Sequence, residues 1–142
     1  MITNLDQIIE EVKSKGKKRL AVAYAEDSHT LGAVSNAVDR GIVDAILVGN
    51  PENIKKICAE HNIDAEKFTI VEGSSDVKCV EIAVKMVKEG EADVLMKGLV
   101  STDKYMRGIL NKEYGLVPPK GTLSHVTVVQ VPAYHKLLTV AD

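Results

Sequence analysis

Aromatic residues are scarce in this sequence. Trp is absent, there is one Phe, and aromatic residues make up only 4% of the 142 residues. Because 45% of the residues are hydrophobic, the core must be built from Val, Ile, Leu and Ala, as in many open α/β sheets. The length supplies enough apolar material for one hydrophobic core and therefore for one domain.

An apolar run long enough to cross a membrane is also absent. A spanning helix needs about 20 apolar residues, and no run in the sequence approaches that length. The first twenty residues carry Asp6, Glu10 and Glu11 in an amphipathic pattern, which is unlike a signal peptide. We therefore expect a cytoplasmic protein with no membrane partner.

Neither sign of charge dominates. The chain has 18 Lys and Arg against 20 Asp and Glu, which gives a formal net charge of −2. The basic residues are scattered rather than gathered into one stripe, so we expect no nucleic acid partner. The one basic run, Lys15, Lys17, Lys18 and Arg19, is interpreted as the solvated exit of a helix.

The sequence has few groups suited to covalent or metal chemistry. The two cysteines, Cys58 and Cys79, have no CxxC or Cys/His spacing, and each falls on an apolar helical stripe, so we interpret both as buried, inert thiols. No Ser-His-Asp arrangement and no carboxylate pair with metal-ligand spacing can be defended. The residues therefore assign neither a covalent nucleophile nor a metal.

Hydrophobic periodicity and turn residues predict helices that alternate with short strands. Strands are expected at residues 19–25, 44–48, 68–71 and 93–96, and helices at residues 4–15, at 28–40, after Asn50 and Pro51, from residues 74–76 to Gly90, and around 105–110. Right-handed crossovers return each strand parallel to the last, so this order predicts a three-layer α/β/α fold with a mainly parallel sheet. The apolar runs 123–131 and 137–140 are too close together for a crossover, which predicts a C-terminal antiparallel hairpin.

The loop after the fourth predicted strand is the best candidate for a ligand site. Lys97 supplies a cation, Gly98 lets the backbone approach a ligand, and the hydroxyls of Ser101 and Thr102 precede a helix N-terminus. Arg107, five residues further on, can add a bidentate donor. The alternative is that Ser101 or Thr102 only caps the helix, that Gly98 only turns the chain, and that Lys97 and Arg107 are solvated. The spacing matches no Walker or dinucleotide-binding motif.

Two further places are weaker candidates. Asp27 follows the first strand, on the ligand side of such a sheet, although capping of the next helix explains this residue nearly as well. Ser124 and His125 begin the first strand of the expected hairpin, where His125 can hydrogen-bond a ligand or act as acid or base, or can be structural.

Several segments together carry a resemblance to a known family. The stretches AVAYAEDSHTLGAV, DAILVGNPENI, ADVLMKGLVSTDKYMRGILNKEYGL and LSHVTVVQVPAYHKLLTVAD resemble the phosphate butyryltransferase and phosphate acetyltransferase family across almost the whole chain. The resemblance implies a reversible transfer of a short acyl group between coenzyme A and inorganic phosphate, giving acyl phosphate. It implies small-molecule substrates, namely acyl-CoA and phosphate, with coenzyme A as a substrate and no bound cofactor or metal.

The same resemblance gives expectations for individual residues and for domain organisation. Lys97, Gly98, Ser101 and Thr102 map onto the loop shared by the family, and Arg107 falls where acetyl-branch relatives carry a substrate-binding arginine. Relatives are about twice as long, so residues 1–142 are expected to form a single α/β domain, the first of two, with the second domain absent. The catalytic base is then expected elsewhere, the isolated chain is expected to be inactive, and the full-length form is expected to be a homo-oligomer. The alternative is a non-catalytic module that binds phosphate or a nucleotide.

Overall fold

The computed structural model describes residues 1–142 and contains the expected elements in the expected order. The elements are α1 (Leu5–Ser14), β1 (Lys18–Ala23), α2 (Ser28–Asp39), β2 (Val43–Gly49), α3 (Pro51–Glu60), the short 3-10 helix η1 (Ala65–Lys67), β3 (Thr69–Glu72), α4 (Asp76–Lys88), β4 (Val94–Lys97), α5 (Thr102–Ile109), β5 (Val126–Val129) and β6 (Leu138–Ala141). Only η1 was not expected from the sequence. No helix is both long enough and apolar enough to cross a lipid bilayer.

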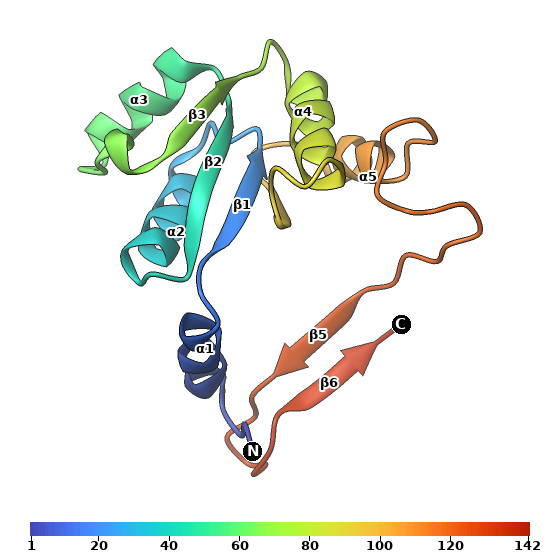
Figure 1. Cartoon of the computed structure of the whole chain (residues 1–142). Helices are drawn as coiled ribbons and strands as arrows, with labels where there is room; N and C mark the ends of the chain where they lie inside the picture. The colour runs from blue at the N-terminus through green and yellow to red at the C-terminus, as the bar shows by residue number, and fades with distance from the viewer.

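The four central strands form a parallel sheet in the order β3-β2-β1-β4. Leu20 of β1 lies opposite Ala45 of β2 on one side and Val94 of β4 on the other. The chain moves outward from β1 to β2 to β3 and then crosses back to β4. The prediction of a mainly parallel sheet with helices on both faces is therefore confirmed (Figure 1).

The hydrophobic core occupies both faces of this sheet. Because side chains alternate along a strand, Leu20 and Val22 of β1 pack with α2 and α3, whereas Ala21 and Ala23 pack with α4. The first face carries the larger side chains, and the second is lined by small residues that allow α4 to lie close to the strands. As expected, Cys58 and Cys79 are free and buried, one on each face.

Each helix begins at a residue whose side chain caps it. Asn4, Asp27, Asn50, Ser75 and Ser101 each accept a hydrogen bond from a backbone amide in the first turn of α1 to α5 respectively. Such caps satisfy amides that have no partner inside the helix. They explain why α1 to α4 begin within two residues of the predicted starts, whereas α5 begins at Thr102, three residues before the predicted range.

The interpretation of the basic run as a helix exit is wrong for Lys18, whereas Arg19 lies in a strand, as the predicted strand at residues 19–25 requires. Lys18 and Arg19 begin β1, because Lys18 pairs with β2 and the Arg19 backbone lies opposite Asp44. The Arg19 side chain donates to both carboxylate oxygens of Asp93, at 3.1 and 3.0 Å, and to the carbonyl oxygen of Gly90 at 2.8 Å. These contacts fasten the start of β1 to the segment that leads into β4.

The expected antiparallel hairpin is confirmed, and it lies apart from the parallel sheet (Figure 1). β5 pairs only with β6, with Val126 opposite Ala141 and Val129 opposite Leu138. Every residue of the two strands is exposed. A hydrogen bond of 2.9 Å from the Leu5 amide to the side-chain oxygen of Gln130 joins the hairpin to α1.

Candidate functional site

The strand order identifies one place where a ligand can bind. β1 and β4 are neighbours, but the connection after β1 leads to β2 on one side, whereas β4 is reached from β3 by the return crossover. In open α/β sheets, ligands bind beyond the carboxyl ends of the strands at such a switch point. The loops at this point are residues 24–27 after β1 and residues 98–101 after β4, and we call them the switch-point loops.

Backbone hydrogen bonds hold the two switch-point loops together. The Gly98 amide donates to the Ala23 carbonyl oxygen at 2.9 Å, and the Leu99 amide donates to the Tyr24 carbonyl oxygen at 2.8 Å. A Cβ atom added to Gly98 would overlap the Tyr24 carbonyl oxygen and lie 2.7 Å from the Ala23 carbonyl oxygen. Gly98 is therefore needed for the approach of the two loops, and no other residue fits there without a shift of the backbone.

The loop after β4 presents the groups that the sequence analysis singled out. Lys97 is the last residue of β4, its side chain is exposed, and it takes part in no ion pair. Ser101 caps α5, with its hydroxyl oxygen 3.3 Å from the Lys104 amide, and Thr102 is exposed in the first turn. A cation, an exposed hydroxyl and a helix N-terminus therefore share one edge of the sheet, an arrangement that suits a negatively charged group.

Asp27 lies in the neighbouring loop and caps α2. Its Oδ2 atom accepts a hydrogen bond of 3.0 Å from the Thr30 amide. Its Oδ1 atom is buried and has no hydrogen-bond partner. Glu26, the preceding residue, is fully engaged, because its two oxygens accept hydrogen bonds from the Asn50 amide at 2.6 Å and from the Asn53 side chain at 3.0 Å. Glu26 thus connects the start of α2 to the start of α3.

Arg107 pairs with a residue of its own helix. It lies five residues beyond Thr102 on α5, is exposed, and pairs with Asp103 at 2.9 Å. Lys104 instead joins α5 to α4, because its ammonium group lies 2.6 Å from the carboxylate of Asp76 at the start of α4. The hydrogen bond from Lys104, helped by one from the Val77 amide, holds the pKa of Asp76 below its usual range.

Ser124 and His125 lie in the segment that leads into the hairpin, which Figure 1 draws apart from the parallel sheet. Both residues are exposed. The His125 amide donates to the Asp142 carboxylate at 3.1 Å, and a ring nitrogen lies 3.4 Å from the Thr127 hydroxyl. These contacts stay within the hairpin and do not bring either residue to the switch point, so a role for them remains a prediction.

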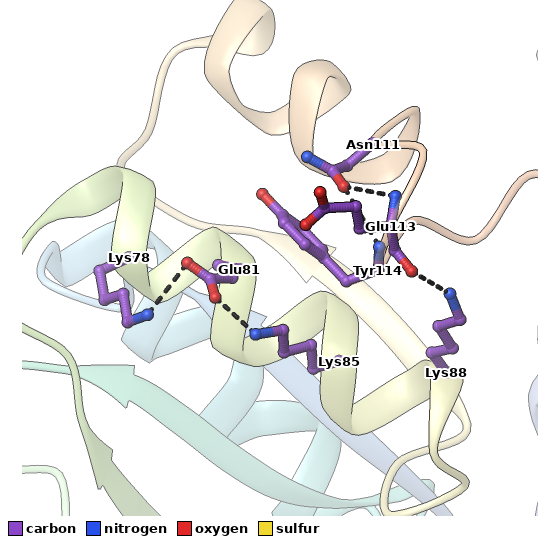
Figure 2. Close-up of polar contacts among 7 residues, drawn as sticks. All are labelled: Lys78, Glu81, Lys85, Lys88, Asn111, Glu113 and Tyr114. Atoms are coloured by element: carbon purple, nitrogen blue, oxygen red, sulfur yellow. Dashed lines mark hydrogen bonds and ion pairs between the residues drawn. The ribbon is translucent and has the colours of Figure 1, made fainter.

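A polar network fixes α5 by holding the segment that follows it against α4 (Figure 2). Lys85 bonds to Glu81 over 2.6 Å, and its ammonium group lies 5.3 Å from the centre of the Tyr114 ring. Lys88 donates to the Glu113 carbonyl oxygen at 2.8 Å. These contacts join the exit of α5 to α4, and the Lys104–Asp76 pair joins its first turn to the same helix.

Sequence reasoning missed two residues of this region. Tyr24 directly follows β1 and has φ of 63°, a left-handed backbone that a bulky residue rarely adopts, and the sequence contains no sign of it. No sequence pattern singles out Lys104, although its place three residues after the Ser101 cap puts it in the first turn of α5. In addition, no group of three or more His, Cys, Asp or Glu side chains is arranged to hold a metal ion.

The main hollows in the surface lie away from the switch point. One runs along α1, others surround residues 110–119, and one of about 120 Å³ lies between α4 and α5 beside Lys104 and Gly108. The switch point is set by the strand order, which follows from the hydrogen-bonded topology, whereas the hollow along α1 is a wide, shallow feature beside an exposed helix. Lys97, Ser101 and Thr102 are exposed, so the switch point is an open edge of the sheet.

Comparison with known proteins gives consistent relatives. The chain is 43% identical over all 142 residues to a phosphate butyryltransferase of Clostridium acetobutylicum and 33% identical over 138 residues to a phosphate acetyltransferase of Thermotoga maritima. It covers 47% and 46% of these two proteins, so the chain spans about half the length of the relatives it matches. Those relatives are named for phosphate acyl transfer, but each contains as much sequence again outside the match.

A solved structure is similar as well. The branched-chain phosphotransacylase from Enterococcus faecalis V583 superposes with a TM-score of 0.71 at 25% identity, over 88% of this chain and 42% of that chain. The model of the family described as phosphate acetyl/butaryl transferase matches residues 4–81, which is more than half of the chain. On this match, the chain belongs to the phosphate acetyl/butaryl transferase family.

Proposed function

We propose that this chain supplies one part of a phosphate acyltransferase of the phosphate butyryltransferase type, which moves a short acyl group reversibly between coenzyme A and inorganic phosphate. The observation that carries the proposal is the match to a phosphate butyryltransferase at 43% identity. The aligned region covers all 142 residues and therefore includes the switch-point loops. The chain is assigned the anion-binding side of the site, and residues 1–142 are taken as the first of two domains.

The chemistry requires an anion to be held while a thiol reacts. In the direction that consumes acyl phosphate, the coenzyme A thiolate attacks the acyl carbonyl, a C–S bond forms, the C–O bond to phosphate breaks, and the thiol proton passes to a base. The phosphate that departs needs donors and cations placed in advance. Lys97, the first turn of α5 and the Thr102 hydroxyl are suited to that role, and Gly98 and Asp27 shape the loops around it. No residue of this chain is assigned as the base.

The open switch point supports a further part of the proposal. Acyl transfer from a reactive acyl phosphate needs a site that excludes water, whereas Lys97, Ser101 and Thr102 are all exposed here. We therefore expect the 142-residue chain to bind phosphate or coenzyme A without turnover. We expect the complete enzyme to be a cytoplasmic homo-oligomer that acts on acyl-CoA and phosphate and needs no cofactor of its own.

A chimera tests this proposal directly. The 142 residues of this chain would replace the matched residues of the Clostridium acetobutylicum relative, and the purified chimera would be assayed with butyryl-CoA and phosphate by release of free thiol. We expect activity within about tenfold of that relative. The variant Lys97→Met of the chimera should lower kcat/KM for phosphate by about 10²-fold, as does loss of one donor to a developing charge.

A matched variant separates an effect of the site from a general loss of charge. Lys55 is an exposed lysine of α3, on the face of the sheet opposite α4 and α5, so Lys55→Met should leave the kinetics of the chimera unchanged. A folded chimera with no activity would count against the acyltransferase proposal. Equal effects of the two variants would remove Lys97 from the site. Tight binding of a nucleotide by the isolated chain, with an inactive chimera, would favour the binding-module alternative.

A further inference from the structure

Tyr24 adopts an unusual backbone conformation at the switch point. Its φ of 63° lies in the left-handed region, where a bulky residue costs free energy and is found where the surrounding structure holds it. Here the backbone is held on both sides, because the Tyr24 carbonyl oxygen accepts from the Leu99 amide at 2.8 Å and the Ala25 amide donates to the Val48 carbonyl oxygen at 3.0 Å. The turn directs the chain out of β1 and fixes where the Tyr24 ring can lie.

The Tyr24 hydroxyl has no partner in the protein. The ring is partly buried and packs on the core face that contains Cys79 and Val80, yet no hydrogen bond involves its oxygen. The hydroxyl of Tyr105, which packs on the same face, lies 3.4 Å from the Leu95 carbonyl oxygen. A tyrosine hydroxyl beside a core usually finds a hydrogen-bond partner. Asp27 Oδ1 is the one side-chain nitrogen or oxygen atom that is both buried and without a hydrogen-bond partner. The Tyr24 hydroxyl also has no partner, so it is not buried and a ligand can reach it.

The groups around Tyr24 make its hydroxyl a donor. Burial, followed by the negative charges of Glu26 and Asp76, raises its pKa above the ordinary value, while Lys104 acts in the opposite direction. The phenol therefore stays protonated at neutral pH. The two carboxylates are already occupied, Glu26 by α3 and Asp76 by Lys104. Lys97 lies opposite Ala23 in the register of β1 and β4, next to the position of Tyr24 along the chain, and takes part in no ion pair, so a cation is available at the switch point for an anionic ligand.

We propose that the Tyr24 hydroxyl donates a hydrogen bond to a phosphoryl oxygen of the ligand that binds at the switch point. This inference rests on the proposed function and adds to it a ligand-contacting residue from the opposite loop. The ligand would then be held from two strands, by Lys97 and α5 after β4 and by Tyr24 after β1. The phosphoryl group can belong to inorganic phosphate or to coenzyme A, and the experiment below uses both.

The variant Tyr24→Phe removes only the hydroxyl and keeps the ring, so its packing and backbone are preserved. Isotope-labelled wild-type and variant chains of 142 residues would be titrated with inorganic phosphate and with coenzyme A, and dissociation constants obtained from amide shifts. We expect about tenfold weaker binding of the ligand that Tyr24 contacts, which is the usual effect of losing one hydrogen bond to a charged group. Tyr105→Phe is the matched control, and it should lower thermal stability without changing either affinity.

A second readout needs no variant. With tyrosine labelled at Cζ, the Tyr24 resonance of the wild-type chain should move on addition of the ligand, whereas that of Tyr105 should stay in place. If the wild-type chain binds but Tyr24→Phe binds equally tightly, or the Tyr24 resonance does not respond at saturation, the inference is wrong and the proposed function stands. If the wild-type chain binds neither phosphate nor coenzyme A, the anion site of the proposed function fails together with the inference.

Discussion

The variant Gly98→Ala tests the geometry of the switch point most directly. Its added Cβ would overlap the Tyr24 carbonyl oxygen and lie 2.7 Å from that of Ala23, so the backbone after β4 has to move away from β1. That movement weakens the hydrogen bonds from the Gly98 and Leu99 amides, which contribute about 0.5–1.5 kcal/mol each. With the strain of overpacking, we expect the free energy of unfolding to fall by about 2–4 kcal/mol.

Urea denaturation followed by circular dichroism measures this loss, and Gly32→Ala is the matched control. Gly32 lies inside α2, and a Cβ added there would meet nothing within 4 Å. Alanine is the better helix former, so this variant should gain about 0.5–1 kcal/mol. The two substitutions are chemically identical and are expected to have opposite signs. A Gly98→Ala chain as stable as the wild type, to within about 0.5 kcal/mol, would refute the described contact between the switch-point loops.

Two further predictions concern stability. Hydrogen bonds from Arg19 lower the pKa of Asp93 to about 2, so this carboxylate stabilises the fold above its unfolded pKa of about 4, and the contribution disappears as the pH falls from 4 toward 2. Asp93→Asn should therefore lower the melting temperature at pH 6 but converge with the wild type near pH 2, and a difference independent of pH would contradict this. Leu47→Ala should lower the free energy of unfolding by about 2–5 kcal/mol, because Leu47 is fully buried. Val77→Ala, at a half-exposed position, should change it by less than about 0.5 kcal/mol. Equal losses for the two variants in urea denaturation would contradict the assigned core.

Most of the fold could be predicted because its determinants are local. The caps Asp27, Ser75 and Ser101 mark helix starts through contacts within three residues. Short apolar strands between such helices leave a parallel sheet as the simplest arrangement. The short spacing between the last two apolar runs allows only a hairpin, and the structure contains one.

The parts that sequence could not give depend on contacts between distant residues. Helical periodicity places Lys104 and Arg107 on neighbouring positions of α5, but it does not say which of them faces α4. That choice is made by Gly108, whose missing side chain lets α5 approach Val80, so that Lys104 meets Asp76 and Arg107 is left to pair with Asp103. The position of the hairpin relative to the sheet is likewise set by contacts that no local pattern encodes.

The isolation of the hairpin has a consequence for how the protein exchanges its amide protons. An isolated two-stranded ribbon is marginal in water, and β5 and β6 bury no side chain that would keep it closed. The hairpin should open and its amides should exchange hydrogen for deuterium long before those of β1, which is hydrogen-bonded to a strand on each side. The protection of amides against hydrogen exchange should therefore fall sharply past the turn at Pro118. A thermal melting curve reports mainly the unfolding of the parallel sheet and would not detect the opening of the hairpin.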